Sequence, residues 1–287
     1  MDFSNHNNYI KVKDYSVSGE EFELLLDQEL QLLKTYPQPS AEKLGSYYES
    51  DDYISHTDGK RSLFEKLYHA VKQKALRDKI QLIEKFQPTK GKILDIGAGT
   101  GDFLITAQKN GWDITGIEPS VKAKSIASDK GVSFVNTSSN IADQSMDVIS
   151  MWHVLEHVPD VNAQITELKR ILKPNGVIII AVPNFKSYDA QYYGKFWAAY
   201  DVPRHLWHFS KTSIRMLFAK QDLELVKIFP MKFDSFYVSL LSEKYKTGKM
   251  NFVKGFFTGL QSNIKASRNF EYSSHIYVIK HVKNLIN

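Results

Sequence analysis

A glycine-rich turn after an apolar run is the first feature of the chain that could do chemistry. The segment 94–101 reads LDIGAGTG, with Gly97, Gly99 and Gly101 in alternate positions. Positions without a side chain let a ligand approach the backbone, and amides at the start of a following helix can meet its polar groups. Glu118 ends the next apolar run, where a carboxylate can accept hydrogen bonds from ribose hydroxyls. Any one glycine could mark an ordinary tight turn, but together these residues predict a site for a ribose-bearing ligand.

The glycine spacing argues against a dinucleotide. A dinucleotide-binding turn needs Gly-x-Gly-x-x-Gly so that a pyrophosphate fits over the helix start, whereas this turn continues with Asp102. The carboxylate of Asp102 would repel a pyrophosphate, while Asp95 and its neighbours suit a cationic sulfonium and an amino group. S-adenosylmethionine (SAM) carries both cations, so the turn predicts SAM rather than NAD or FAD.

A second reactive group, His153-Val154-Leu155-Glu156-His157, follows the predicted strand MDVISMW. It lies at the carboxyl edge, where open α/β sheets bind ligands. The same letters spell the inverted zinc-protease motif, but that motif needs a long helix and a further carboxylate ligand. We therefore expect no bound metal. Glu156 and His157 are also explained as groups that cap and orient the following helix.

A third group, residues 197–210 (WAAYDVPRHLWHFS), follows the predicted fifth strand. Asp201 and His205 could form a carboxylate–imidazole pair that accepts a proton, and Arg204 could hold an anionic group bidentately. These three residues and His153 are the catalytic candidates. The alternative is a buried polar network that fixes the loop, with Ser210 capping the next helix.

Five segments in order resemble class I SAM-dependent methyltransferases, nearest to the quinone-biosynthesis O-methyltransferases and their uncharacterised bacterial relatives. They are DIGAGTG, IEPS, MDVISMWHVLEHVPD, LKRILKPNGVIIIAVPN and DVPRHLWHFS, within residues 46–231. The resemblance implies a Rossmann-like, doubly wound mixed sheet of seven strands. It also implies methyl transfer from SAM to a small or lipid-like acceptor, with oxygen as the expected position. A SAM-fold binding or regulatory protein without turnover is the alternative.

The resemblance further implies roles for single residues. The expected cofactor residues are Asp95, Gly97, Gly99, Gly101, Glu118, Ser138, Trp152, Tyr53 and His56. Glu118 would hold the ribose, Ser138 would lie near adenine, and Trp152 would close the pocket unless it only packs in the core. Tyr53 and His56 belong to a segment that folds over SAM in related enzymes. Some quinone O-methyltransferases hold a divalent metal on Glu-x-x-Glu-His, but here His153 replaces the first Glu.

Alternating predicted strands and helices position these groups. Strands are expected over 92–97, 114–119, 132–136, 146–152 and 176–184, with helices over 102–111, 121–131 and 161–173. This alternation is typical of a parallel, doubly wound sheet. Apolar residues at helical spacing predict a further helix over 63–86. A helix over 210–221 and late strands over 223–230 and 275–282 suit an antiparallel edge.

The flanks predict an N-terminal appendage over residues 1–45 and a methyltransferase domain over 46–287, with insertions over 185–209 and 235–270. Asp27 and Leu30 stand where zinc-ribbon relatives carry Cys-x-x-Cys, so the appendage is either a ribbon without its metal or an unrelated short segment. Apolar residues of 250–266 share one helical face near several lysines. That helix either packs on its own domain as a lid or dips into a membrane surface.

Composition excludes several other functions. The chain has no cysteine, which removes disulfides and thiolate chemistry. Its formal net charge of +5 is spread along the chain rather than clustered, so we expect no nucleic-acid partner. The polar N-terminal segment lacks the apolar core of a signal peptide, and no window reaches the length of a membrane span. The expected location is the cytoplasm.

Overall fold

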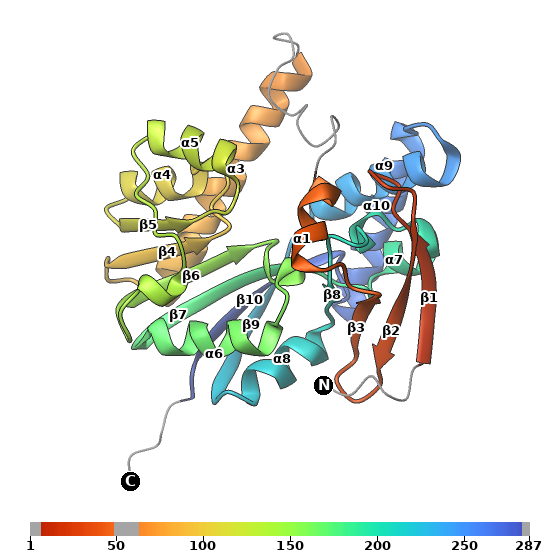
Figure 1. Ribbon diagram of the computed structural model, residues 1–287. Coiled ribbons are helices and arrows are strands. Elements are labelled where there is room, and N and C mark those ends of the chain that lie inside the picture. Colours follow the sequence, from red (N-terminus) through yellow and green to blue (C-terminus); the bar gives the residue numbers. More distant parts are fainter. Residues whose placement is uncertain (1–6, 49–62, 283–287) are drawn as a thin grey trace.

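The computed structural model describes residues 7–48 and 63–282, which form two sheets flanked by helices (Figure 1). Tyr53 and His56 lie outside the described residues, so their predicted part in a lid is not addressed by the fold. The larger sheet has six strands in the order β5-β4-β6-β7-β10-β9, and the smaller one has four in the order β1-β2-β3-β8.

The larger sheet carries the predicted site at its carboxyl edge. Its strands are β4 (Lys92–Ile96), β5 (Asp113–Ile117), β6 (Met146–Trp152), β7 (Leu172–Pro183), β9 (Leu223–Pro230) and β10 (Ser274–His281). Strands β5, β4, β6 and β7 are parallel, whereas β10 runs antiparallel to both β7 and β9. Central strands buried on both faces read as continuous apolar runs, as the buried run 177–182 of β7 does. The doubly wound mixed sheet predicted from the sequence is therefore confirmed.

The prediction of seven strands is wrong by one among the described residues. Segment 132–136 makes only a single parallel bridge to the sheet, between Phe134 and Gly116. The Gly116 amide donates to the Ser133 carbonyl at 2.9 Å, and the Val135 amide donates to the Gly116 carbonyl at 3.0 Å. The segment thus lies beside β5 at the seventh position, but the polar residues that follow it turn into the short 3-10 helix η2 (Ser138–Asn140) and the ladder does not continue.

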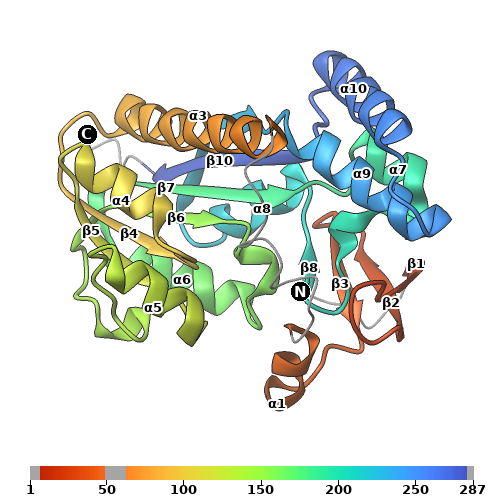
Figure 2. The ribbon, with the colours of Figure 1, turned by 90° about the horizontal axis from the view of Figure 1, so that it is seen from above.

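Helices cover both faces of the larger sheet (Figure 2). One face carries α3 (Leu63–Phe86), α4 (Asp102–Lys109) and α5 (Val121–Asp129), and the other carries α6 (Val161–Ile171) and α8 (Lys211–Ala219). Successive residues of a strand point to opposite faces. Accordingly Val148 of β6 packs with Ile80 and Leu104, whereas its neighbour Ile149 packs with Leu168. The predicted N-cap of α8 is confirmed, since the Ser210 hydroxyl accepts from the Ser213 amide at 3.1 Å.

The smaller sheet joins the N-terminal segment to the first insertion. Its antiparallel strands are β1 (Asn7–Lys13), β2 (Glu21–Asp27), β3 (Leu32–Tyr36) and β8 (Trp207–His208), and it leads into α1 (Ala41–Leu44) and the 3-10 helix η1 (Gly45–Tyr48). Asp27 closes the turn between β2 and β3 by accepting from the Leu30 amide at 2.8 Å. A turn of this kind is compatible with a metal-less ribbon, and that interpretation of the appendage stays a prediction.

Both insertions are helical. The first contains α7 (Tyr188–Tyr193) and the 3-10 helices η4 (Gly194–Phe196) and η5 (Ala198–Tyr200). The second is a hairpin of α9 (Asp234–Thr247) and α10 (Phe252–Asn269), which lie side by side at the edge of the molecule (Figures 1 and 2). Within the described residues, no helix has the length and apolar character needed to cross a bilayer.

Candidate functional site

The glycine turn joins the end of β4 to α4, and Gly97 and Gly99 have different structural roles in it. Gly97 and Gly99 both adopt positive φ, +75° and +53°. A Cβ on Gly97 would lie 2.3 Å from Cγ2 of Val154, whereas a Cβ on Gly99 would meet nothing within 4 Å. Gly97 therefore lets the turn pack against the segment after β6. Gly99 faces open space, as a turn that admits a ligand requires.

Glu118 at the end of β5 is fastened to the same turn. Its Oε2 accepts from the Gly99 amide at 2.7 Å, and its Oε1 accepts from the Ser120 amide at 2.8 Å. An ionised carboxylate has about four acceptor positions, so acceptor capacity remains for hydroxyl groups of a ligand. The two elements of the predicted cofactor site, the glycine turn and Glu118, are brought together as the sequence indicated.

Asp95, Lys79 and Trp152 lie close to this turn, Asp95 fully buried and the other two half-buried. Asp95 accepts from the Ser150 hydroxyl at 2.6 Å, and its burial raises the pKa to about 7 although Ser150 and the charge of Lys79 oppose the shift. The Lys79 ammonium lies 4.0 Å from the ring centroid of Trp152, and burial lowers its pKa. The Trp152 ring packs edge-on to Phe103, which favours the packing alternative for this residue.

Sequence reasoning did not select Lys79, although a signal was present. Lys79 falls between Leu76, Ile80 and Ile83, on the apolar face of helix α3. A lysine on the core-facing side of an amphipathic helix is unusual because its charge must be desolvated. Here it contributes a cation between Asp95 and the aromatic wall of the site.

Ser138 contacts helix α6. It lies in η2, and its carbonyl accepts from Nη2 of Arg170 in α6 at 3.1 Å. Ser138 follows the segment 132–136 that bridges to β5, which is the position in the chain order that the sequence predicted. Its contact with adenine stays a prediction.

His153 is held between two carboxylates immediately after β6. It adopts φ +57°, its Nδ1 lies 3.3 Å from Oε1 of Glu156, and its Nε2 lies 3.2 Å from Oδ2 of Asp234. Burial lowers the pKa of His153, but the hydrogen bonds and charges of Asp234 and Glu156 outweigh burial and raise it to about 10. His153 is therefore an imidazolium at neutral pH. It links the edge of the large sheet to the first turn of α9, and it is unable to accept a proton.

A second cluster joins two sequence motifs that lie far apart. The ligand-type atoms of Glu156, His157 and His205 all lie within 4.8 Å of one another. His157 Nδ1 is 3.0 Å from the Arg204 carbonyl and His205 Nδ1 is 2.9 Å from the Ala199 carbonyl. The Nδ1–H of His205 faces a carbonyl oxygen, so Nε2 of that ring carries the lone pair. Nδ1 of His157 lies 3.0 Å from the Tyr48 hydroxyl as well as from the Arg204 carbonyl.

These residue types fit a divalent cation, since metal-binding histidines commonly donate their other ring N–H to a backbone carbonyl. Glu156 is only 1% exposed, and apart from His153 Nδ1, which lies 3.3 Å from Oε1, its carboxylate oxygens have no hydrogen-bond partner among the described residues. A cation held there would polarise an acceptor hydroxyl. The absence of a metal, expected from the sequence, stays a prediction that elemental analysis of the purified protein tests.

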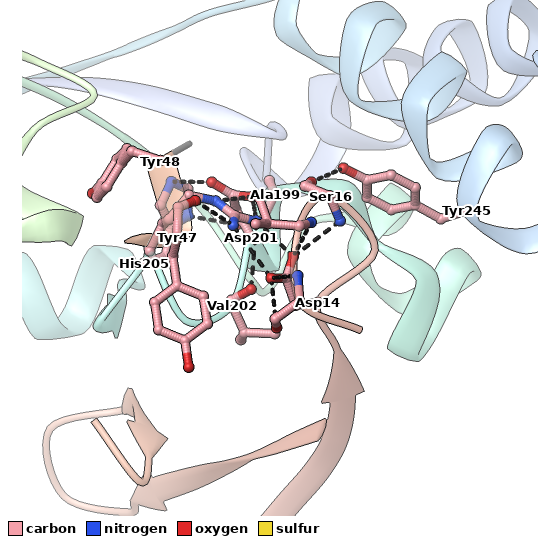
Figure 3. A network of polar contacts seen from close by, with 12 residues as sticks. Asp14, Ser16, Tyr47, Tyr48, Ala199, Asp201, Val202, His205 and Tyr245 are labelled. Atoms are coloured by element: carbon pink, nitrogen blue, oxygen red, sulfur yellow. Dashed lines mark hydrogen bonds and ion pairs between the residues drawn. The ribbon is translucent and has the colours of Figure 1, made fainter. Parts of the chain in front are cut away.

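A polar network joins Asp14 of the N-terminal segment to Asp201 of the first insertion (Figure 3), and Arg204 connects the two carboxylates. Its guanidinium donates to Oδ1 of Asp201 at 2.6 Å, to Oδ1 of Asp14 at 3.0 Å and to the Tyr47 carbonyl at 3.0 Å. His205 Nε2 lies 3.9 Å from Oδ2 of Asp201, which is too long for a hydrogen bond. The geometry favours the polar-network alternative for Arg204 and Asp201 over anion binding and over a tight proton-handling pair.

His205 is set apart from this network by its neutral ring. Burial, followed by the charge of His157, lowers the pKa of His205 to about 4 even though Asp201 and Glu156 oppose the shift. The side chain is almost fully buried, and its tautomer is fixed by the Ala199 carbonyl. Of the four catalytic candidates, His205 is the one that presents an unprotonated ring nitrogen.

Comparison with known proteins identifies the family of the chain. Residues 68–228 match the methyltransferase domain family, and the match covers more than half of the chain. The chain therefore belongs to this family. It is 30% identical over 136 residues to a ubiquinone biosynthesis O-methyltransferase of Actinobacillus pleuropneumoniae, covering 42% of this chain and 58% of that protein. The counterpart from Vibrio atlanticus is 32% identical over 120 residues, covering 37% and 51%. The matched region spans about half the length of these curated relatives.

A solved structure confirms the fold. Geranyl diphosphate C-methyltransferase from Streptomyces coelicolor superposes with a TM-score of 0.55 at 16% identity, covering 79% of this chain and 83% of that one. Together the family and the fold confirm the class I, SAM-dependent methyltransferase assignment made from the motifs. The sequence similarity to the curated relatives also confirms the resemblance to the quinone-biosynthesis O-methyltransferases.

Proposed function

We propose that this protein transfers a methyl group from SAM to a small or lipid-like acceptor, at an oxygen atom. The observation that carries the proposal is the open space over Gly99 beside the carboxylate of Glu118. Two curated relatives of the central region are named as ubiquinone biosynthesis O-methyltransferases, which supports oxygen as the attacking atom.

The reaction needs little from the protein beyond alignment. A lone pair of the acceptor oxygen forms a bond to the methyl carbon while the carbon–sulfur bond breaks, and the sulfur keeps the electron pair. SAM thereby becomes S-adenosylhomocysteine, and the acceptor proton passes to a base. Holding both partners in line supplies most of the acceleration. Glu118 would fix the ribose, and the turn at Gly99 would leave room for the methionine part.

We assign to His205 the role of accepting the proton of the acceptor hydroxyl. Its Nε2 is unprotonated and faces the cluster at the carboxyl edge, whereas His153 is already charged. With its pKa lowered to about 4, His205 is a weak base. It suits an acidic hydroxyl such as a phenol, because such a proton becomes more acidic as the oxygen gives charge to the methyl group.

The test compares His205→Ala with His281→Ala, a histidine at the far end of β10. Calorimetry measures SAM affinity, and a panel of catechols and other phenols measures formation of S-adenosylhomocysteine. General-base help supplies about a hundredfold or more, so His205→Ala should lower turnover by that order and leave SAM affinity near normal. A purely structural His205 would instead lower thermal stability, SAM affinity and turnover together.

The same experiment separates enzyme from binding protein. Turnover of any panel member by the wild-type protein supports catalysis. Tight SAM binding with no product from any acceptor would support the alternative of a SAM-fold regulatory protein. Failure to bind SAM would overturn the proposal as a whole.

A further inference from the structure

Helix α10 packs with its small residues inward and its large apolar residues outward. Its buried residues are Gly255, Thr258, Gly259, Ser262 and Ala266. A Cβ on Gly255 would lie 2.9 Å from the Leu240 Cα, and one on Gly259 would lie 2.9 Å from the Phe236 Cα. The backbones of α9 and α10 therefore approach closely. Helix α10 therefore packs on its own domain through its small residues, and its large apolar side chains are left outside that contact.

The outward face is apolar and continuous along the helix. Six of its large side chains are between 37% and 68% exposed: Phe252, Val253, Phe256, Phe257, Leu260 and Ile264. Phe233 and Tyr237 at the start of α9 and Met250 in the connecting turn are exposed as well. We call these nine residues the hairpin face. Soluble monomers rarely expose a contiguous apolar surface of this kind unless it binds something.

The charge of the hairpin indicates the partner. Between Glu243 and Glu271 the chain has six cationic residues and no acidic one; the cations are Lys244, Lys246, Lys249, Lys254, Lys265 and Arg268. Lys254 reaches back to Glu243 at 3.3 Å, and Lys265 lies 3.7 Å from the ring centroid of Tyr188. Phenylalanines on one side and lysines around them are the composition of a helix that lies in the headgroup region of an anionic membrane.

We propose that the hairpin face docks onto the surface of an anionic lipid bilayer. A second copy of the chain fits less well, because a twofold interface would set this face against itself. The cations of this segment, one of which, Lys254, is paired with Glu243, would then oppose those of the other copy. A bilayer with anionic headgroups satisfies the apolar side chains and the charges at once.

Docking would also place the reaction site near the lipid phase. Asp234, in the first turn of α9, is paired with His153 at 3.2 Å, so the hairpin is fastened to the carboxyl edge of the large sheet. Only this consequence, delivery of a lipid-like acceptor, rests on the proposed function. The docking itself does not.

The experiment is cosedimentation with vesicles of phosphatidylcholine, with or without about 30% phosphatidylglycerol. Wild-type protein should bind the anionic vesicles, and binding should weaken as salt is raised. The double variant Phe256→Ser, Phe257→Ser should bind at least about tenfold more weakly, because two phenylalanines leave the interface. The control double variant Val121→Ser, Val226→Ser changes exposed valines elsewhere and should bind normally.

Several results would overturn the proposal. They are equal binding by the phenylalanine variant, equal binding to neutral vesicles, and no binding by the wild type. Sedimentation velocity measures self-association. If the wild-type protein forms a dimer and binds no vesicles, and the phenylalanine variant is a monomer, the hairpin face is the contact with a second copy of the chain. SAM affinity measured on the same samples reports separately on the proposed function.

Discussion

Replacing Glu118 tests the cofactor site most directly. In Glu118→Ala, the amides of Gly99 and Ser120 lose their acceptor, and a bound ribose loses its carboxylate partner. A hydrogen bond to a charged group contributes about 1.5–3 kcal/mol, and a neutral one about 1 kcal/mol. Part of the loss falls on the free protein, whose turn is also weakened. We therefore expect SAM affinity to fall by about 1–3 kcal/mol, which is about 5- to 150-fold in Kd.

Calorimetric titration with SAM and with S-adenosylhomocysteine measures this change. Glu118→Gln should fall between the wild type and Glu118→Ala, because one amide oxygen accepts from Gly99 or Ser120 but not from both. Glu224→Ala removes an exposed carboxylate on the outer strand β9 and should bind normally. Unfolding curves show whether each variant is folded. A folded Glu118→Ala protein with unchanged affinity would refute the assignment of the ribose to this residue.

Three further outcomes are expected. Gly99→Ala should weaken SAM binding more than about tenfold, since its methyl group would enter the open space. The control Gly131→Ala, also at positive φ in open space, should cost about 1 kcal/mol of stability and leave SAM affinity unchanged. Equal SAM affinities of the two variants would contradict the role of the turn. Arg204→Ala should lower the free energy of unfolding by about 3–5 kcal/mol, because the buried carboxylate of Asp14 and the half-buried carboxylate of Asp201 lose their cation. A loss below about 1 kcal/mol in urea denaturation would show that the network is not structural. Ring-nitrogen NMR should find His153 protonated well above pH 7 and His205 neutral down to about pH 4. Because folding raises the pKa of His153, its charge stabilises the fold; this stabilisation is complete below the unfolded pKa of about 6.5 and is lost as pH rises toward 10. Because folding lowers the pKa of His205, the fold loses stability as pH falls from about 6.5 toward 4. Ordinary titration of both rings would contradict the two environments.

The cofactor half of the site follows from local rules. Parallel strands end at one edge, so a glycine turn after the first strand and an acid after the second must meet there. Gly99 and Glu118 do so, at 2.7 Å. The helix over 63–86 and the cap at Ser210 likewise follow from periodicity and residue type within a few turns.

The acceptor half could not be predicted in this way. Asp201, Arg204 and His205 are neighbours in sequence, and their types suggested one catalytic group. The fold separates His205 from the other two: Arg204 pairs with Asp201 and with Asp14 of the N-terminal segment, whereas His205 lies in the cluster with Glu156. The partners come from elements far away in the chain, and residue types in one motif carry no information about that choice.

The sequence by itself determined the family, the order of the strands and helices of the larger sheet apart from segment 132–136, and the glycine turn with its carboxylate, because each depends on contacts between neighbours in the chain or on the shared edge of parallel strands. The tertiary structure alone decided which side of α10 is buried, where Lys79 enters the interior and which groups surround His205. Helical periodicity marks an apolar face without saying what covers it. In α10 the close approach of two backbones through Gly255 and Gly259 buries the opposite, small-residue face, and the phenylalanines are left on the surface.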